Sequence, residues 1–300
     1  MTSARQYPPK QNQSTPFRLP DDATIGYAHL RIPDLQRSLG FYQQLLGLVL
    51  IDQDERTARL SPTSAGPLLV CLDQLANASP KPPRTTGLYH VAIRLPSRPA
   101  LARLLTRLLE QRYPLQGASD HLVSEAIYLA DPDGNGLELY ADRPRHQWPV
   151  VDGIVSMATD PLDVRGLLAT ASDEPWQGID PGTDIGHVHL QVSDLGRAEA
   201  FYCGILGFEV TQRDYPGALF VSAGGYHHHI GLNTWGTRGV PPPPPDAVGL
   251  IDFSVKVDDP AVRLEIQARL EYAGVPVEIT DDDGKSPIMT HDPDGNGVVI

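Results

Sequence analysis

The sequence is poor in cysteine and contains no long apolar run. Its 300 residues include two cysteines, Cys71 and Cys203, which are too few for a disulfide framework or for a metal site built from cysteine pairs. We therefore expect a reducing, cytoplasmic location. No apolar stretch approaches the roughly 20 residues that cross a bilayer. Residues 1–16 are polar and proline-rich, without the apolar core of a signal peptide, and no membrane partner is expected.

Basic residues are also scarce. The chain has 24 lysines and arginines against 37 aspartates and glutamates, which gives a formal net charge of −13 at pH 7. Proteins that bind nucleic acid or an anionic membrane surface present a basic face, so the composition argues against both kinds of partner. An anionic small ligand would need local help, such as a bound cation.

A long internal repeat dominates what the sequence does contain. The stretch GHVHLQVSDLGRAEAFYCGILGFEV, which begins at Gly186, rewrites GYAHLRIPDLQRSLGFYQQLLGLVL, which begins at Gly26, and 186 − 26 = 160. A second motif, DPDGNG, occurs at Asp131 and again at Asp292, and 292 − 131 = 161. The protein is therefore a tandem duplication, and each copy carries both motifs.

Each copy contains two modules of one strand, one helix and three further strands, so we expect an α+β fold with four βαβββ modules in tandem. In the first module, residues 27–32 alternate as a strand does, Asp34 caps a helix with apolar positions at helical spacing, and Gly47 ends that helix. We expect a flexible tail, an N-terminal domain holding modules one and two, a linker with a short helix around 161–171, and a C-terminal domain holding modules three and four. The ranges are 1–21, 22–143, 144–183 and 184–300.

The motifs resemble those of the vicinal oxygen chelate superfamily, which includes glyoxalase I, bleomycin-resistance proteins and type I extradiol dioxygenases. The segments GHVHLQV, SDHLVSEAIYLADPDGNGLELYADRPRHQW and GALFVSAGGYHHHIGLNTW are most similar to the two-domain catechol 2,3-dioxygenase branch, and the likeness covers nearly all of residues 22–300. The resemblance implies that modules pair into U-shaped mixed sheets with the helices outside. It also implies a metal-dependent enzyme that cleaves a catechol with O2, a small aromatic diol being the substrate.

In that superfamily the metal ligands lie on the inward face of a module's first and last strands. Strand alternation turns His90 and Glu138 of module two inward, and also His187 of module three. Pairing modules in sequence leaves incomplete sets unless His29 contributes, whereas pairing module two with module three gives two imidazoles and a carboxylate. This set suits non-haem Fe(II), with Mn(II) as the alternative, and leaves positions open for a catechol and O2.

Further candidates would act on the substrate. Alternation against the following strand predicts that His229 and His227 point inward, and a histidine here resembles the acid-base histidine of extradiol enzymes. We favour His229, which could instead be a fourth ligand, as in the isomerases. Tyr128, ten residues before Glu138, matches the active-site tyrosine of the extradiol pattern. His121 takes the place of a substrate-orienting histidine, at a spacing slightly shorter than usual.

Several alternatives stay open at this stage. The chain could be a glyoxalase-like isomerase or lyase, or a binding protein without turnover that uses a cavity between modules one and four. His187 and His189 share a strand face, and the family spacing selects His187. DPDGNG is expected to serve as a turn, because it needs glycine at positive φ. The sequence leaves open the preferred catechol, the choice between iron and manganese, and whether the chain forms a homo-oligomer.

Overall fold

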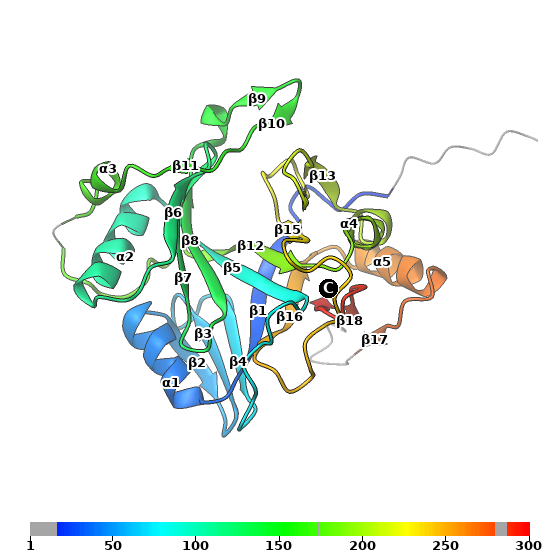
Figure 1. Ribbon diagram of the computed structural model, residues 1–300, viewed down its shortest axis with the longest axis horizontal. Helices are drawn as coiled ribbons and strands as arrows, with labels where there is room; N and C mark the ends of the chain where they lie inside the picture. The colour runs from blue at the N-terminus through cyan, green and yellow to red at the C-terminus, as the bar shows by residue number, and fades with distance from the viewer. Residues whose placement is uncertain (1–16, 173, 280–286) are drawn as a thin grey trace, which may run out of the picture.

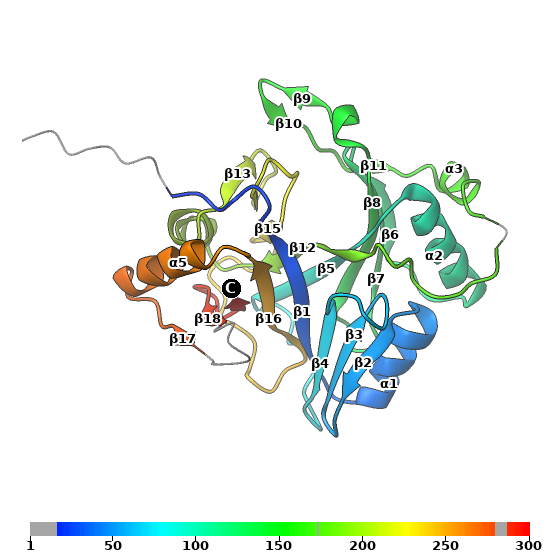
Figure 2. The same cartoon turned by 180° about the vertical axis from the view of Figure 1, so that it is seen from behind.

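The computed structural model describes residues 17–172, 174–279 and 287–300, so most of the expected flexible tail lies outside the described residues. The fold is α+β, as predicted, with two curled mixed sheets and helices on their outer faces (Figures 1 and 2). No helix in the described ranges is long and apolar enough to cross a membrane.

The elements repeat in the expected order, strand, helix and three strands. Module one contains β1 (Thr24–Ile32), α1 (Leu35–Leu39), η1 (Gly40–Leu45), β2 (Val49–Gln53), β3 (Thr57–Ser61) and β4 (Val70–Gln74). Module two contains β5 (Gly87–Leu95), α2 (Arg98–Glu110), β6 (Gly117–Asp120), β7 (Ser124–Ala130) and β8 (Gly136–Asp142). Module three contains β12 (Asp184–Gln191), α4 (Leu195–Glu199), η3 (Ala200–Ile205), β13 (Glu209–Gln212), β14 (Ala218–Ser222) and β15 (Ile230–Asn233). Module four contains β16 (Gly249–Lys256), α5 (Pro260–Tyr272), β17 (Glu278–Ile279), β18 (Ile288–His291) and β19 (Gly297–Val299).

The first helix of each half starts at the predicted cap. The Asp34 carboxylate accepts the backbone N–H of Arg37, so α1 begins one residue later. After one turn the helix widens into the π-helix η1, and Gly47 ends it at a φ of +80°. The predicted helix is therefore correct in extent, and its second part is a π-helix, which helical spacing alone does not reveal.

Buried tyrosines link the two repeated motifs. The Tyr42 hydroxyl in η1 donates to Asp131 of the DPDGNG turn at 3.0 Å, and Tyr202 in η3 donates to Asp292 of the second copy at 2.9 Å. Asp131 also accepts the backbone N–H groups of Asp133 and Asn135. DPDGNG is thus a turn, as predicted, whose first carboxylate is satisfied within the protein. This link joins module one to module two and module three to module four.

Each of the two large sheets contains one module from the first half of the chain and one from the second half. The nine-stranded sheet has the order β11-β6-β7-β8-β5-β12-β15-β14-β13, and the eight-stranded sheet has the order β17-β18-β19-β16-β1-β4-β3-β2. Modules two and three therefore meet through the antiparallel pair β5 and β12, and modules four and one meet through β16 and β1. The pairing of modules two and three that the ligand positions favoured is the one the structure has. Because both sheets span the two halves, the division into two domains at the linker stays a prediction.

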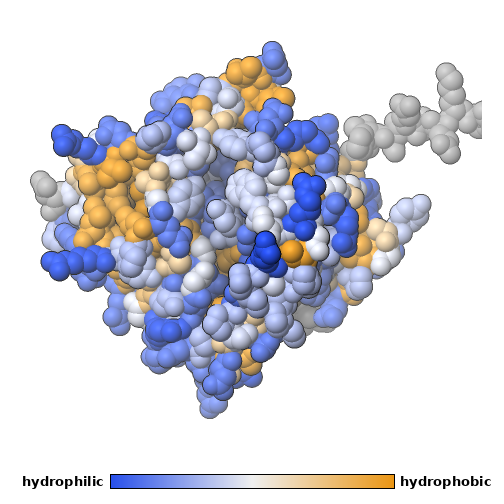
Figure 3. Space-filling view, viewed as in Figure 1, coloured by the Kyte–Doolittle hydropathy of each residue, from blue (hydrophilic) through white to orange (hydrophobic). Residues whose placement is uncertain are grey.

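The linker contains η2 (Arg145–Gln147), β9 (Val150–Val151), β10 (Ile154–Val155), β11 (Asp160–Pro161) and α3 (Val164–Leu168). The helix expected around 161–171 is present as the shorter α3, which packs near α2. Strand β11 extends the nine-stranded sheet by pairing with β6. The hairpin of β9 and β10 projects from the body (Figure 1) and carries apolar surface at its tip (Figure 3), where Val150, Val151 and Ile154 are exposed. These two strands were not predicted, because two-residue strands leave no period to detect.

Candidate metal centre

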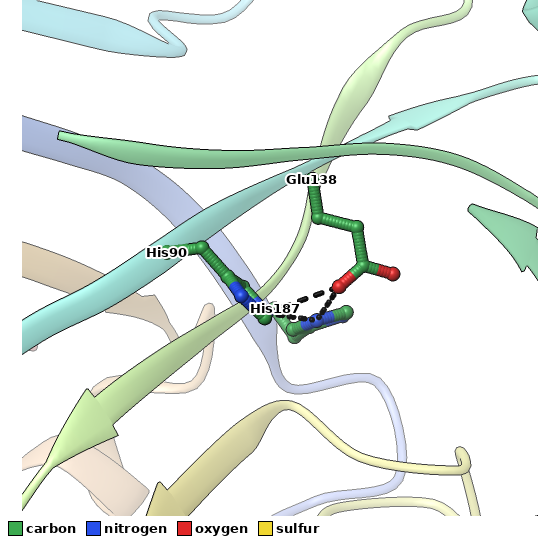
Figure 4. Close-up of side chains that lie close together, drawn as sticks. All are labelled: His90, Glu138 and His187. Atoms are coloured by element: carbon green, nitrogen blue, oxygen red, sulfur yellow. Dashed lines mark hydrogen bonds and ion pairs between the residues drawn. The ribbon is translucent and has the colours of Figure 1, made fainter. Parts of the chain in front are cut away.

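Three side chains from three neighbouring strands converge on one face of the nine-stranded sheet (Figure 4). Ala92 of β5 lies opposite Glu138 of β8 on one side and opposite His187 of β12 on the other. Cross-strand partners share a face, so Glu138 and His187 flank the small Ala92 side chain. His90, two residues earlier on β5, points the same way. The register therefore brings together the three residues that alternation predicted to face inward.

The ligand atoms of these residues lie at metal-binding spacing. His90 Nε2 lies 3.0 Å from Glu138 Oε2, His187 Nε2 lies 3.3 Å from the same oxygen, and the two Nε2 atoms are 3.4 Å apart. Two ligands bonded at about 2.1 Å to one ion are about 3.0 Å apart at a right angle and about 3.4 Å apart at a tetrahedral angle. Within the described part of the chain, this is the one group of three potential ligands that lies so close together.

The protonation states also fit a metal ion. Burial lowers the pKa of His187 to about 4, so its ring is neutral at pH 7. Burial alone would raise the pKa of Glu138, but the two neighbouring imidazoles hold it well below its usual range. A buried carboxylate is costly without a compensating charge, and Glu138 is only 3% exposed. Neutral imidazoles and an ionised carboxylate are the states in which these side chains bind metals.

A cavity of about 390 Å³ opens next to the three residues. Its volume is within the range of small-molecule sites, about 300–1,000 Å³. Aromatic side chains form much of its wall, among them Tyr89, Phe220 and Trp235, and Tyr89 and Trp235 pack edge to face with ring centroids 5.8 Å apart. Among the described residues that line the cavity there is no lysine or arginine.

Tyr128 and His121 both line this cavity, where the family resemblance places them. Tyr128 of β7 is the cross-strand partner of Glu138, and burial together with that carboxylate raises the pKa of its phenol. His121 Nδ1 lies 2.6 Å from the Ala158 carbonyl oxygen, which can only accept, so Nδ1 carries a proton. In a neutral ring Nε2 then accepts the hydrogen bond of the Tyr128 hydroxyl, at 2.6 Å.

The three consecutive histidines are placed differently from the prediction. We expected His227 and His229 to point inward on a strand, but β15 begins only at Ile230 and the preceding residues form a loop. His227 and His228 both border the cavity, and the His228 ring lies 4.1 Å from that of His187. The prediction that His229 faces the site is wrong. His229 lines a separate cavity of about 130 Å³ with Arg94 and accepts the backbone N–H of Ala223 at 3.1 Å.

Sequence reasoning missed His228 because it extended strand alternation too far. Gly224 and Gly225, separated from the histidines by Tyr226, both have positive φ, of +59° and +63°. A glycine pair of this kind is a turn signal, and it could have shown that alternation does not reach back from Ile230 to His227.

His189 borders the cavity beside the three converging residues. It lies directly opposite His90 in the sheet, and its Nε2 is 3.0 Å from the Asn233 side-chain nitrogen. An amide nitrogen donates, so that ring nitrogen is already occupied. Position 231 on the next strand must be glycine, because a Cβ at Gly231 would lie 2.8 Å from the His189 ring.

The eight-stranded sheet has the equivalent positions without the ligand set. Tyr27 and Asp252 stand where the repeat places His187 and His90, and Val299 takes the place of Glu138. His29 Nδ1 bonds Asp252 Oδ2 at 2.9 Å. The expected metal site is therefore not duplicated among the described residues of this sheet.

This ion pair predicts a pH dependence of stability. Burial would lower the pKa of His29, but Asp252 and the neighbouring Cys71 raise it to about 10. A raised folded-state pKa means that the contribution is fully present below the unfolded value, about 6.5, and is lost as the pH rises through about 10. We expect the free energy of unfolding to fall by about 1.5–3 kcal/mol more in the wild type than in His29→Gln between pH 6.5 and pH 10. Urea unfolding of both proteins at the two pH values measures this, and equal losses would contradict it.

Comparison with known proteins places the chain in a family. The family model described as glyoxalase/bleomycin resistance protein/dioxygenase superfamily matches residues 24–139 and 184–300. The chain belongs to this superfamily. The two matched regions correspond to the two copies of the repeat, with the linker between them.

Individual relatives are consistent with this membership. The chain is 45% identical over 265 residues to a protein of Bacillus subtilis (strain 168) named catechol-2,3-dioxygenase, and the match covers 87% of this chain and 92% of the relative. Among solved structures, a putative dioxygenase from Bacillus subtilis has a TM-score of 0.64 at 14% identity, covering 95% of this chain and 86% of that one. Glyoxalase I from Zea mays has a TM-score of 0.56 at 18% identity, covering 93% and 92%. The two structures share the fold.

Proposed function

We propose that the protein is a non-haem Fe(II) extradiol dioxygenase of the catechol 2,3-dioxygenase type, which cleaves catechol or a substituted catechol with O2. The observation that carries the proposal is the convergence of His90, Glu138 and His187 at ligand spacing beside an aromatic-walled cavity. The 45% identity to the Bacillus subtilis protein named catechol-2,3-dioxygenase supports the reaction type. Two imidazoles and one carboxylate suit Fe(II), with Mn(II) as the alternative metal.

The metal would be held by His90, Glu138 and His187. When bound there, it would supply open positions for both catechol oxygens and for O2, and a path for electrons between them. The protein's own residues position the substrate. Because the Tyr128 hydroxyl donates to His121, its oxygen is free to accept a hydrogen bond from a substrate hydroxyl.

His228 takes the acid-base role that the sequence suggested for His229. It borders the cavity next to His187, and burial holds the pKa of its ring well below the usual value. A neutral imidazole at this place can accept a proton from a catechol hydroxyl and return it later. His227 is its neighbour, with the two Nδ1 atoms 2.9 Å apart.

The cavity also suggests the charge of the substrate. A carboxylate on the catechol ring would have no arginine or lysine partner among the described lining residues, and burying an unpaired charge is costly. The aromatic walls instead favour an apolar substituent. We therefore propose neutral catechols as the substrates.

The function is tested by loading the protein with Fe(II) without oxygen, adding a panel of catechols and then admitting O2. A yellow ring-fission product, formed with one O2 consumed per catechol, supports the proposal. Iron-loaded protein that forms no product from any member of the panel would refute it. Tightly held zinc without oxygen consumption would favour a glyoxalase-like isomerase instead.

A further inference from the structure

A chain of hydrogen bonds leads from the cavity to the partly buried carboxylate of Asp142. His228 Nδ1 lies 2.9 Å from His227 Nδ1, and His227 Nε2 lies 3.0 Å from Asp142 Oδ1. Asp142 ends β8, the strand that carries Glu138. The chain therefore runs from the loop of module three to the closing strand of module two, across the junction of the two modules.

Asp142 is fixed as a hydrogen-bond acceptor. Burial would raise the pKa of its carboxyl, but His227, Arg94 and Tyr226 hold it below the usual value. The Tyr226 hydroxyl lies 2.9 Å and the Arg94 guanidinium 3.3 Å from Asp142 Oδ2. An ionised carboxylate with these donors around it has no proton to give. His227 must therefore donate through its Nε2–H.

The proton positions along the chain follow from this fixed end. With the His227 ring neutral, it carries one N–H, and a proton at Nε2 leaves its Nδ1 as an acceptor. The facing Nδ1 of His228 then carries that ring's proton, and Nε2 of His228 keeps a free lone pair. We infer that Asp142 and His227 are positioning residues that hold His228 in its Nδ1-protonated tautomer. This positioning role rests on the proposed function, in which His228 is the base, because a base needs an unprotonated nitrogen.

The test reads the tautomers directly. Full-length protein with ¹⁵N-labelled histidine and bound diamagnetic Zn(II) is examined by NMR, and the two rings are assigned by loss of signals in His227→Gln and His228→Gln. We expect the proton at Nε2 in His227 and at Nδ1 in His228. In Asp142→Asn the side-chain amide can donate to His227, so the Nε2-protonated form of His228 should become a major species.

Two further variants keep the test decisive. Asp184→Asn removes another carboxylate that bonds Arg94 without touching the histidines, and should leave both tautomers unchanged. If Asp142→Asn does not fold, His227→Phe removes the acceptor of the His228 Nδ1 proton and should also release the Nε2-protonated form. An Nε2-protonated His228 in the wild type, or no change in these variants, would overturn the inference.

The NMR measurement of the tautomers does not depend on turnover. As a second measurement, with iron bound, Asp142→Asn should lower kcat by on the order of 100-fold, the lower range for loss of a general base. If the protein shows the expected tautomers but no ring-cleaving activity, the inference stands and only the proposed function is refuted. If the protein is active but Asp142→Asn does not change the His228 tautomer, only the inference is refuted.

Discussion

Replacing His187 by alanine is expected to abolish ring cleavage and metal retention together. His187 supplies the ligand that module three contributes, while His90 and Glu138 both come from module two. Without it, the remaining imidazole and carboxylate form a two-ligand site with no contact across the β5–β12 junction. We expect the metal affinity to fall by on the order of 100-fold or more, since even loss of a residue that only supports a ligand costs about 10–100-fold. Metal content after gel filtration and catechol turnover measure the two effects.

His189→Ala is the matched control. This histidine lies on the same strand face, two residues further on, is also buried, and borders the same cavity. Because its Nε2 is bonded to Asn233, the variant should keep a full metal content even if turnover changes. Retained iron in His187→Ala, or lost iron in His189→Ala, would show that the ligand assignment between the two histidines is wrong.

Replacing Glu138 by glutamine is expected to have the second large effect. The side chain keeps its size but loses the only anionic ligand of the set, so iron should be held at least about 100-fold more weakly and activity should collapse. The metal-free protein should melt at nearly the same temperature, because glutamine keeps the size of the side chain and its carbonyl oxygen can still accept a hydrogen bond. What should disappear is the metal-linked stabilisation, about 2.7 kcal/mol for the wild type at a metal concentration of 100 times Kd. Melting curves with and without Fe(II) under nitrogen measure it.

Glu125→Gln separates loss of a ligand from loss of a buried carboxylate in the sheet. Glu125 lies on β7, is 4% exposed, and accepts hydrogen bonds from Arg98, one of them at 3.1 Å. This variant should lower the melting temperature in the presence and absence of metal alike, while metal binding persists. If Fe(II) raises the melting temperature of Glu138→Gln as much as that of the wild type, Glu138 is not a metal ligand.

Much of the candidate site could be predicted from local patterns. Strand alternation has a period of two, and it turned His90, Glu138 and His187 to the face on which they converge. Tyr128, whose ten-residue spacing to Glu138 matches the extradiol pattern, is the cross-strand partner of that residue. The repeat showed that DPDGNG recurs with the Phe-Tyr helix, and the structure gives the cause, a buried hydrogen bond between Tyr42 and Asp131.

The histidine triplet shows where local patterns fail. Alternation holds only while residues belong to a strand, and the chain turns at Gly224 and Gly225 before the triplet. His228 therefore borders the cavity, and His229, which strand alternation favours, lines another one. Nothing in the segment around Asp142 reveals that it meets His227, which is 85 residues away.

The sequence by itself determined the four modules, their inward faces and the kinds of ligand that each one offers, because these depend on short-range periodicity along one chain segment. Only the tertiary structure decided which edges of the modules join, since strand pairing uses backbone groups that all residues share and leaves little trace in the side-chain pattern. The ligand positions pointed to the pairing of β5 with β12, but its register, with Ala92 between Glu138 and His187, exists only in the folded sheet. The Asp142–His227–His228 chain has the same origin, because residues from two modules become neighbours only when that sheet has formed.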